Sequence, residues 1–492
     1  MADKLRKASP FGIDYPSNIV FVTRLSGREL ARFDNAFDCA PGRNPLYAEH
    51  AQWIPQYTVE QVMRDHLAGI ESVQLRLRCQ LSSIAQRGDS VIASIASDAD
   101  NALLEVEAQY VVGCDGARSV VREVIGARLE GSYGLSRNYN FVFRAPGLEQ
   151  AHAHGKAIMY WQVSEDQLSI IGPMDSGDRW YFLQTGMAQD ARISKDNAAD
   201  YIRKATGIDL PYEILSCDEW VASKLLATHY RDRRVFIAGD AAHLHPPFGG
   251  FGMNMGIGDA VDLGWKLAAV LQGWGGPALL DSYERERRPV HMRVMEEATA
   301  NHAQLGRALS QAGMEEESAA GEALRASVGQ RIRSAKLSEF HTLGTILGDC
   351  YGDSPVIGTP FGEPPPRDFL NYVPCAQPGH RAPHAWLHDG SSLFDHFGAG
   401  FTLLLSGDAD DGAEAACAAA ELRGIPLTLF CCANAGVRAL YQQPLTLIRP
   451  DQHIAWIGAR WPDQAVDDVL SKVAGFERIA MSDRACSLDP AS

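Results

Sequence analysis

The sequence predicts a multidomain protein of the α/β class, and three observations support this prediction. Two short apolar strands, which we expect to be buried, each run into a turn with glycine and aspartate and then into a helix, at 110–122 and 234–254. Aromatic-rich, strand-like segments fill 157–185, and strands alternate with helices again after residue 376. Strands that alternate with helices favour a parallel sheet covered by helices, whereas the aromatic segments favour an antiparallel sheet.

The composition is that of a globular protein. The chain has 492 residues, of which 46% are hydrophobic and 22% charged, and its length suggests about three domains. The net charge of −16 argues against a nucleic-acid partner, because phosphate binding needs basic surface. No apolar run fits a membrane span or a signal peptide, so we expect a cytoplasmic protein with no membrane partner. The ten cysteines form no Cys-x-x-Cys pair, which argues against structural zinc.

The elements around the two turns can be placed in chain order. Residues 1–7 look like the end of a helix, and apolar spacing predicts another helix over 58–67. Residues 72–112 alternate as a meander of strands. Two long helical patterns cover roughly 254–272 and 277–306. Pro-rich residues follow these helices and form a linker before the final α/β segment.

The first turn reads Gly113-Cys114-Asp115-Gly116, and a helix begins after it near Ser119. Glycine permits a close backbone approach, and free amides at a helix start attract anions. Asp115 stands at the carboxyl end of a strand, where α/β sheets bind ligands. The same residues also fit a plain strand-turn-helix in which Asp115 caps the helix, and the sequence leaves both interpretations open.

The second turn follows the strand at 234–238 and puts Asp240 in the equivalent position. Two prolines and three glycines come next, and they let a stiff backbone lie flat against a large ligand. The helix expected from about Asn254 has an apolar anchoring face, so its N-terminus can point at that ligand. His243 and His245 also allow a metal site, but no third ligand is near, and we expect no metal.

Together the two segments resemble those of the single-component FAD-dependent aromatic hydroxylases, the flavin monooxygenases that act on phenol and hydroxyphenylpropionate. The family's Gly-Asp-Gly segment is matched at 114–122. Its Gly-Asp-Ala-Ala-His…Pro-Pro…Gly-Gly-x-Gly-Met-Asn segment is matched at 239–254, and this second match is long and specific.

The resemblance implies which residues bind FAD. Asp240 would bind the ribityl chain, the loop and helix start after it would line the flavin ring, and Asp115 would help to hold FAD. Gln56 is similar to a family glutamine that reaches the cofactor. The full set of expected FAD-binding residues is Gln56, Asp115, Gly116, Ser119, Arg122, Gly239, Asp240, Ala241, His243, Pro246, Pro247, Gly249, Gly250, Gly252, Met253 and Asn254.

The resemblance also implies the fold: an FAD-binding doubly wound sheet with an inserted antiparallel substrate sheet, and a C-terminal thioredoxin-like domain. Residues 381–386 and 449–456 are similar to the thioredoxin-like tail of the phenol-hydroxylase branch. The family's G-x-G-x-x-G turn is not found in 1–492, and residues 1–7 resemble the helix that follows it. We therefore expect the FAD-binding sheet to be incomplete at its N-terminus, by at least one βαβ unit of about 30 residues.

These expectations give a domain layout. It comprises a first FAD-binding part (1–140), the substrate sheet (141–225), a second FAD-binding part with long helices (226–345), a linker (346–375) and the thioredoxin-like domain (376–485).

The resemblance implies that NAD(P)H reduces FAD, that O₂ adds at flavin C4a, and that the resulting hydroperoxide hydroxylates a small phenolic substrate. The candidate substrate wall, for which core packing is an equally good explanation, is Tyr160, Trp161, Trp180 and Phe182. His229, Tyr230 and His245 are candidate helpers in deprotonating the phenol, and no catalytic base is assigned.

Two alternatives stay open. The same scaffold could hydroxylate a polyketide or antibiotic. In a different class of function, the chain could be a remnant or interaction protein that binds no FAD. The family habit also favours a homo-oligomer.

Overall fold

The structure is a computed structural model, and the residues it describes are 1–98, 102–164, 168–188, 190–303, 309–407, 412–463 and 468–476. The chain divides into two compact units. The first unit consists of Met1–Asn44, Glu49–Met253 and Val294–Thr342. The second unit consists of Pro45–Ala48, Asn254–Arg293 and Leu343–Ser492.

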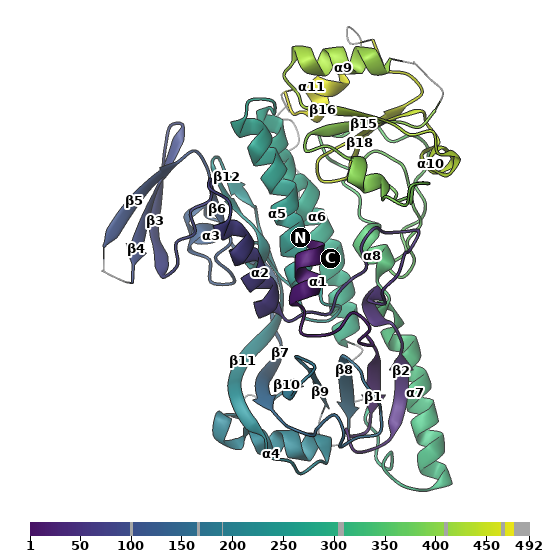
Figure 1. Ribbon diagram of the computed structural model, residues 1–492. Helices are drawn as coiled ribbons and strands as arrows, with labels where there is room; N and C mark the ends of the chain where they lie inside the picture. The colour runs from purple at the N-terminus through teal and green to yellow at the C-terminus, as the bar shows by residue number, and fades with distance from the viewer. Residues whose placement is uncertain are drawn as a thin grey trace, which may run out of the picture. The chain divides into compact units, whose positions relative to one another are not determined.

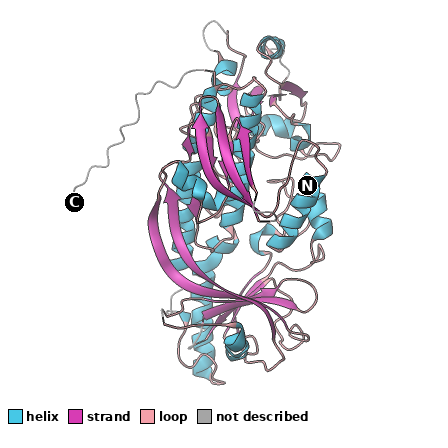
Figure 2. Ribbon diagram, turned by 90° about the vertical axis from the view of Figure 1, so that its left-hand side faces the viewer, coloured by secondary structure: helices cyan, strands magenta, loops and turns pink. Residues whose placement is uncertain are grey.

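The largest element of the first unit is an eight-stranded sheet with the order β14-β11-β7-β10-β9-β8-β1-β2. Its neighbouring strands are antiparallel except β1 and β8, which run parallel with Ile19 opposite Met159. The long strands β7 and β11 are curved (Figure 2). The strands are β1 (Ile19–Val22), β2 (Glu29–Phe33), β7 (Leu129–Arg144), β8 (Met159–Val163), β9 (Leu168–Pro173), β10 (Arg179–Gln184), β11 (Glu213–Ala227) and β14 (His243–Leu244).

The two faces of this sheet are covered by different helices, α4 (Lys195–Thr206) and α7 (Ala319–Phe340) (Figure 1). Because successive side chains of a strand alternate, Tyr160 and Trp161 point to opposite faces. Tyr160 packs in a buried cluster with Ile202 of α4, and Trp161 packs in another with Ile332 of α7. The aromatic residues of 157–185 are therefore shared between two buried faces.

The two apolar strands predicted at 110–112 and 234–238 meet in a separate sheet of the first unit, with the order β12-β13-β6. β6 (Val111–Gly113) runs parallel to β13 (Val235–Ile237), and β12 (Arg231–Asp232) is antiparallel to β13. β13 is fully buried, whereas Val112 of β6 is 37% exposed, so the expectation of a buried strand is correct only for β13. The helix α3 (Val120–Val124) follows β6 as predicted.

The meander expected over 72–112 is present as an antiparallel sheet of β3 (Cys79–Arg87), β4 (Ser90–Ser97) and β5 (Leu103–Ala108). The helix expected over 58–67 is α2 (Gln56–Ala68), and residues 1–7 belong to α1 (Ala2–Ala8). The two long helices are α5 (Phe251–Leu271) and α6 (Pro277–Ala303). The helices α4 and α7 are not among the elements that the sequence pattern predicts.

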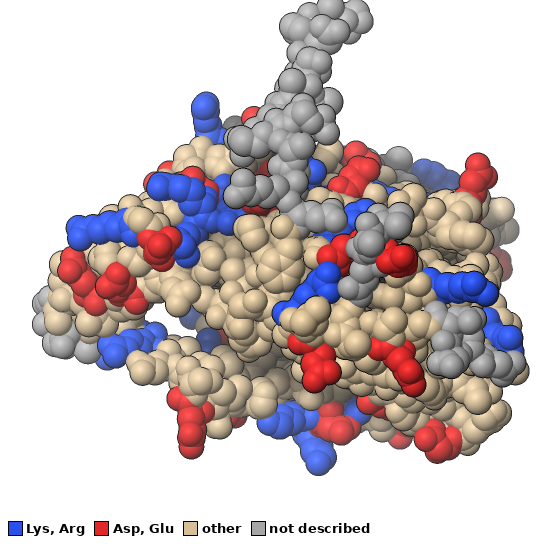
Figure 3. Space-filling view, turned by 90° about the horizontal axis from the view of Figure 1, so that it is seen from above, with Lys and Arg blue, Asp and Glu red and all other residues tan. Residues whose placement is uncertain are grey.

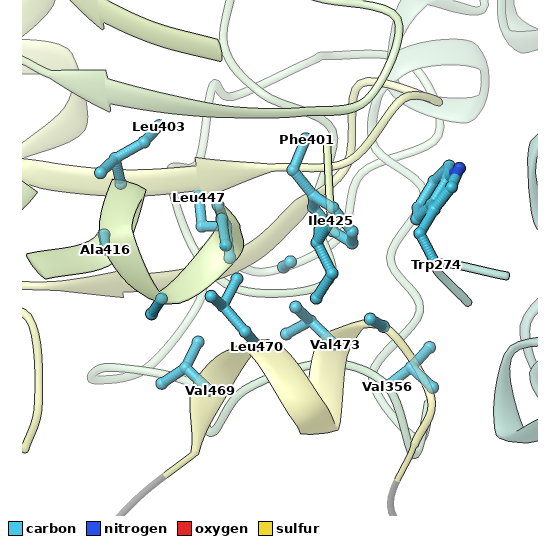
Figure 4. Close-up of a cluster of buried hydrophobic side chains, with 14 of the residues drawn as sticks. Trp274, Val356, Phe401, Leu403, Ala416, Ile425, Leu447, Val469, Leu470 and Val473 are labelled. Carbon is cyan, nitrogen blue, oxygen red and sulfur yellow. The ribbon is translucent and has the colours of Figure 1, made fainter. Parts of the chain in front are cut away.

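The second unit contains a four-stranded sheet with the order β16-β15-β17-β18. β15 and β16 are parallel, whereas β17 is antiparallel to β15 and to β18, an arrangement that agrees with the expected thioredoxin-like domain. Phe401, Leu447 and Leu470 form its core with Trp274 (Figure 4). The elements of the second unit beyond α5 and α6 are α8 (Leu343–Leu347), β15 (Phe401–Leu405), α9 (Ala413–Leu422), β16 (Leu427–Cys431), α10 (Ala435–Tyr441), β17 (Leu445–Ile448), β18 (Ile454–Gly458) and α11 (Val469–Val473).

Two surface properties bear on function. In the described ranges, no helix has both the length and the apolar character that a bilayer crossing requires. On the face that Figure 3 presents, acidic and basic side chains are interspersed, so the net charge of −16 is not gathered in one patch there.

Candidate functional site

The candidate site is the edge at which β6 and β13 end. These strands are parallel, with Gly113 opposite Ile237, so both polypeptide segments leave the sheet on the same side. The Ala238 amide donates a hydrogen bond of 3.0 Å to the Gly113 carbonyl, which holds the two exits together. Asp115 and Asp240 both follow this point in the chain, as the sequence predicts. Carboxyl ends of parallel strands are where open α/β sheets bind their ligands.

In the first turn, Asp115 organises the start of α3. Its carboxylate accepts hydrogen bonds from the Ser119 hydroxyl and from the Val121 amide, the latter at 3.1 Å. The Ser119 oxygen in turn accepts from the Arg122 amide at 2.9 Å, so Ser119 is the N-cap. Gly116 has a φ of +79°, which favours glycine at this turn. The N-cap of α3 is therefore Ser119 and not Asp115, which supports that cap through its bonds to Ser119 and Val121. The role of Asp115 toward FAD stays a prediction.

Arg122 links the two turns. Its guanidinium donates to the Ala117 carbonyl at 2.8 Å and to the Ala241 carbonyl at 3.0 Å. The residue is buried, with 8% of its surface exposed, and both acceptors are uncharged backbone groups. Because a buried guanidinium is costly to leave unbonded, these two bonds fix the distance between the first turn and the second.

In the second turn, Gly239 adopts a φ of +59° and begins a short 3-10 helix that ends at Ala241. Ala241 is buried, but Asp240 points outward and is exposed. The carboxylate of Asp240 accepts no hydrogen bond from any other described residue. A carboxylate in this state at the sheet edge is ready to accept hydrogen bonds from the hydroxyl groups of a ligand.

The segment after Asp240 first returns to the eight-stranded sheet. His243 lies in β14, opposite Leu226 of β11, and is fully buried. Its ring meets that of His245 edge to face, with 4.9 Å between the centroids. The burial of His243 is that of a residue in a sheet strand, so its expected contact with FAD stays a prediction.

The loop Pro246–Gly250 then leads into α5, which begins at Phe251, three residues earlier than expected. Gly252, Met253 and Asn254 therefore form the first turn of that helix. Gly249 and Gly250 have φ values of +88° and +68°, a region that side chains disfavour. A Cβ added at Gly250 or Gly252 would meet nothing within 4 Å, so the backbone is open on that side. Such an open glycine surface can accept a flat ring at close range.

Gln56 is the first residue of α2 and lies on the surface. Its amide nitrogen donates a 2.9 Å hydrogen bond to Glu60, one turn further along the same helix. This local bond would have to break before the Gln56 amide could reach a cofactor. The contact between Gln56 and FAD stays a prediction.

The four candidate substrate-wall residues lie on two different faces. Tyr160, Trp180 and Phe182 share the face that α4 covers, and each has an exposed fraction of 2% or less. Trp161 lies on the opposite face, in the cluster that includes Phe248 of the Pro246–Gly250 loop. The Trp161 and Phe248 ring centroids are 6.2 Å apart. Core packing therefore accounts for the three residues on the α4 face, and only Trp161 lies on the side of the loop.

Sequence reasoning missed Lys336 and Glu339 of α7, because that helix was not predicted. Both are buried on the same face as Trp161. A signal was present in the sequence. Positions 328, 332, 336 and 340 are spaced by four residues, as on one face of a helix, and three of them are apolar (Val328, Ile332 and Phe340), whereas the fourth is Lys336.

Comparisons with known proteins agree with the resemblance. A family model described as FAD binding domain matches residues 29–298, and one described as Aromatic-ring hydroxylase, C-terminal, matches 376–476. Tetracenomycin B2 monooxygenase-dioxygenase of Streptomyces olivaceus is 32% identical over 442 residues, covering 86% of this chain and 77% of the relative. The 2,4-dichlorophenol 6-monooxygenase of Delftia acidovorans is 28% identical over 500 residues, covering 92% and 84%.

Among solved structures, the rebeccamycin biosynthetic enzyme RebC with reduced flavin matches with a TM-score of 0.87 and 34% identity, covering 96% of this chain and 88% of RebC. The fold is therefore that of flavin monooxygenases with a mixed α/β architecture. Within them, this chain belongs to the FAD-dependent aromatic-ring hydroxylases.

Proposed function

We propose that this protein uses FAD, NAD(P)H and O₂ to hydroxylate a phenolic aromatic substrate. The observation that carries the proposal is the parallel pairing of β6 and β13, which directs the turns of Asp115 and Asp240 to one edge of a sheet. Family membership supplies FAD as the ligand for that edge. The two findings are independent, because one is a property of strand pairing and the other of sequence similarity.

The residues at this edge fit FAD. Asp240 offers an exposed carboxylate that no other described residue uses, and ribityl hydroxyls are hydrogen-bond donors. Gly250 and Gly252 leave a backbone surface with no atom within 4 Å of their Cβ positions, which suits a flat ring system. The hydrogen bond from Arg122 to the Ala241 carbonyl keeps these groups in place before a ligand arrives. Less conformational entropy of the two turns is then lost when the ligand binds.

When bound, FAD supplies the activation of O₂ that protein side chains cannot provide. The contribution of this chain is to bind, to orient and to exclude water. Pro246 and Pro247 restrict the loop, and Phe248 is buried within it, with 5% of its surface exposed. With FAD bound, this buried ring would help to exclude water from one side of the site, and exclusion of water protects reactive species from hydrolysis.

We propose that Trp161 backs the substrate site through Phe248. These two rings lie 6.2 Å apart on the same face of the sheet. Tyr160, Trp180 and Phe182 are not part of this proposal, because α4 covers the face on which they lie.

The substrate is proposed to be either a single-ring phenol or a polycyclic phenol of polyketide type. The first class follows from the 28% identical relative named for 2,4-dichlorophenol, and the second from the 32% identical relative named for tetracenomycin B2.

The experiment loads the full chain with FAD and measures NADH and NADPH oxidation with and without a phenol of each class. We expect one class to accelerate oxidation and to yield a product that contains one oxygen atom from isotope-labelled O₂. Bound FAD without labelled product from either class would overturn the hydroxylase proposal. A folded chain that takes up no FAD would instead support the remnant or interaction protein.

A further inference from the structure

The buried stripe of α7 carries a charge. Lys336 occupies a position that the spacing of Val328, Ile332 and Phe340 reserves for apolar residues, and its side chain is fully buried. Burying an ammonium group is costly unless it is paired and hydrogen-bonded. The contacts of this lysine therefore need an explanation.

The Lys336 ammonium contacts its own helix and three other segments of the first unit. It donates a 2.9 Å hydrogen bond to the carbonyl of Asn301, near the end of α6, and a 2.7 Å hydrogen bond to Glu339. It also lies 5.1 Å from the ring centroid of Trp161 in the sheet and 5.6 Å from that of Phe248 in the loop. Both distances are within the range of a cation–π interaction.

Stability alone does not explain this arrangement. A buried ion pair can often be replaced by packed hydrophobic residues with little change in stability. Leucine or methionine at position 336, with an apolar residue in place of its partner Glu339, would complete the apolar stripe of α7. What a hydrophobic side chain could not supply is an attraction directed at two aromatic faces together with a bond to the Asn301 backbone. The charge thus orients groups on other segments.

We propose that Lys336 is a positioning residue that holds Phe248, and with it the Pro246–Gly250 loop, against Trp161. The inference rests on the proposed function, in which this loop lines the flavin ring. Phe248 is the only loop residue whose ring the ammonium contacts among the described residues. Pro247 precedes it and Gly249 follows it, so fixing this one ring restrains a short segment on both sides.

The first test needs no flavin. Hydrogen exchange of the Phe248, Gly249 and Gly250 amides is measured in the full flavin-free chain, because the two prolines have no amide proton. We expect exchange to be about tenfold faster in Lys336→Met, since a desolvated cation–π contact that is lost frees the loop. Lys336→Arg should keep the wild-type rate.

The matched control is Lys156→Met. Lys156 also faces an aromatic ring, that of Tyr15 at 5.7 Å, but 56% of its side chain is exposed. Loop exchange in this variant should match the wild type. Unchanged loop exchange in a folded Lys336→Met variant would overturn the proposal.

A second variant covers the case in which Lys336→Met does not fold. Phe248→Leu keeps Lys336, Glu339 and their hydrogen bonds but removes the ring, and it should speed the Gly249 and Gly250 amides to a similar extent. Unchanged rates there would contradict the proposal.

In the FAD-loaded enzyme, the Lys336→Met variant should release several-fold more H₂O₂ per nicotinamide oxidised, with Lys336→Arg close to wild type. If wild type takes up no FAD, the proposed function fails, while the exchange result still decides the role of Lys336.

Discussion

The ammonium of Lys336 lies 5.1 Å from the ring centroid of Trp161, although the two residues are 175 positions apart in the chain. This contact connects α7, which follows both Gly-Asp turns in the chain, to strand β8, which lies between those turns, on the face that also receives Phe248. The other face of the same strand packs against α4 through Tyr160. The substrate site of the proposed function is therefore expected on the α7 side of the sheet.

We predict that Asp240→Ala weakens FAD binding about tenfold or more. The carboxylate is exposed at the sheet edge, and charged hydrogen bonds to a ligand are worth about 1.5–3 kcal/mol. Flavin fluorescence titration of the full chain measures the dissociation constant. Asp89→Ala is the control, because Asp89 is also exposed in the first unit but pairs with Arg234. Equal weakening in both variants would argue against a specific role for Asp240.

We predict that the two faces of the sheet respond differently to conservative substitution. Trp161→Phe should change the KM for the phenolic substrate several-fold, because Trp161 backs the loop through Phe248. Trp180→Phe should leave KM within about twofold, because Trp180 packs toward α4. Steady-state kinetics of the two variants provide the measurement. The opposite ranking would move the substrate site to the α4 face.

We predict that Arg449→Met destabilises the second unit by about 3–5 kcal/mol. The buried guanidinium bonds to Glu286 at 2.7 and 2.8 Å and to Asp262 at 3.0 Å, and it also pairs with Asp451. Its loss leaves these three buried carboxylates with less positive charge than they need, because the ammonium of Lys266 pairs, among the three, with only Asp262 and Glu286. Urea denaturation followed by circular dichroism measures the change.

The control for Arg449 is Arg423→Met. Arg423 pairs with Asp468 at 2.6 Å, but both side chains are about a quarter exposed. We expect it to cost less than about 1 kcal/mol. A small effect at both arginines would mean that the buried network around Glu286 tolerates the loss of its central cation.

We predict a specific acid sensitivity that depends on His152. Burial lowers the pKa of His152 from 6.5 to about 4, and the neighbouring His154 adds to the shift. The unfolded chain therefore binds more protons than the folded chain between these values, so folding stability falls as the pH drops from 6.5 toward 4. His152→Gln should flatten the pH dependence of the melting temperature in that window. An unchanged slope would contradict the burial of His152.

The sequence predicted the parts of this fold that local chemistry determines. The Gly-Asp turns after 110–112 and 234–238, the meander over 72–112 and the long helices α5 and α6 all follow from spacing and turn residues. The similarity of 239–254 to a known family pointed to FAD, and the family match confirms this.

Other features depend on tertiary packing that spacing does not reveal. Residues 160 and 161 must face opposite ways in any strand, but only the positions of α4 and α7 decide which face belongs to which helix. α7 was missed because its stripe is interrupted by the charge of Lys336. Nor could the sequence show that Ser119 is the N-cap of α3 while Asp115 accepts the Val121 amide, because an aspartate in a turn serves ligands and helix ends equally well.

The most direct test is the visible absorption spectrum of the purified full chain after incubation with FAD and removal of the unbound cofactor. The account predicts flavin absorption bands at close to one FAD per chain, with much lower retention in the Asp240→Ala protein. A folded, colourless protein, or wild type and variant that retain equal amounts, would contradict it.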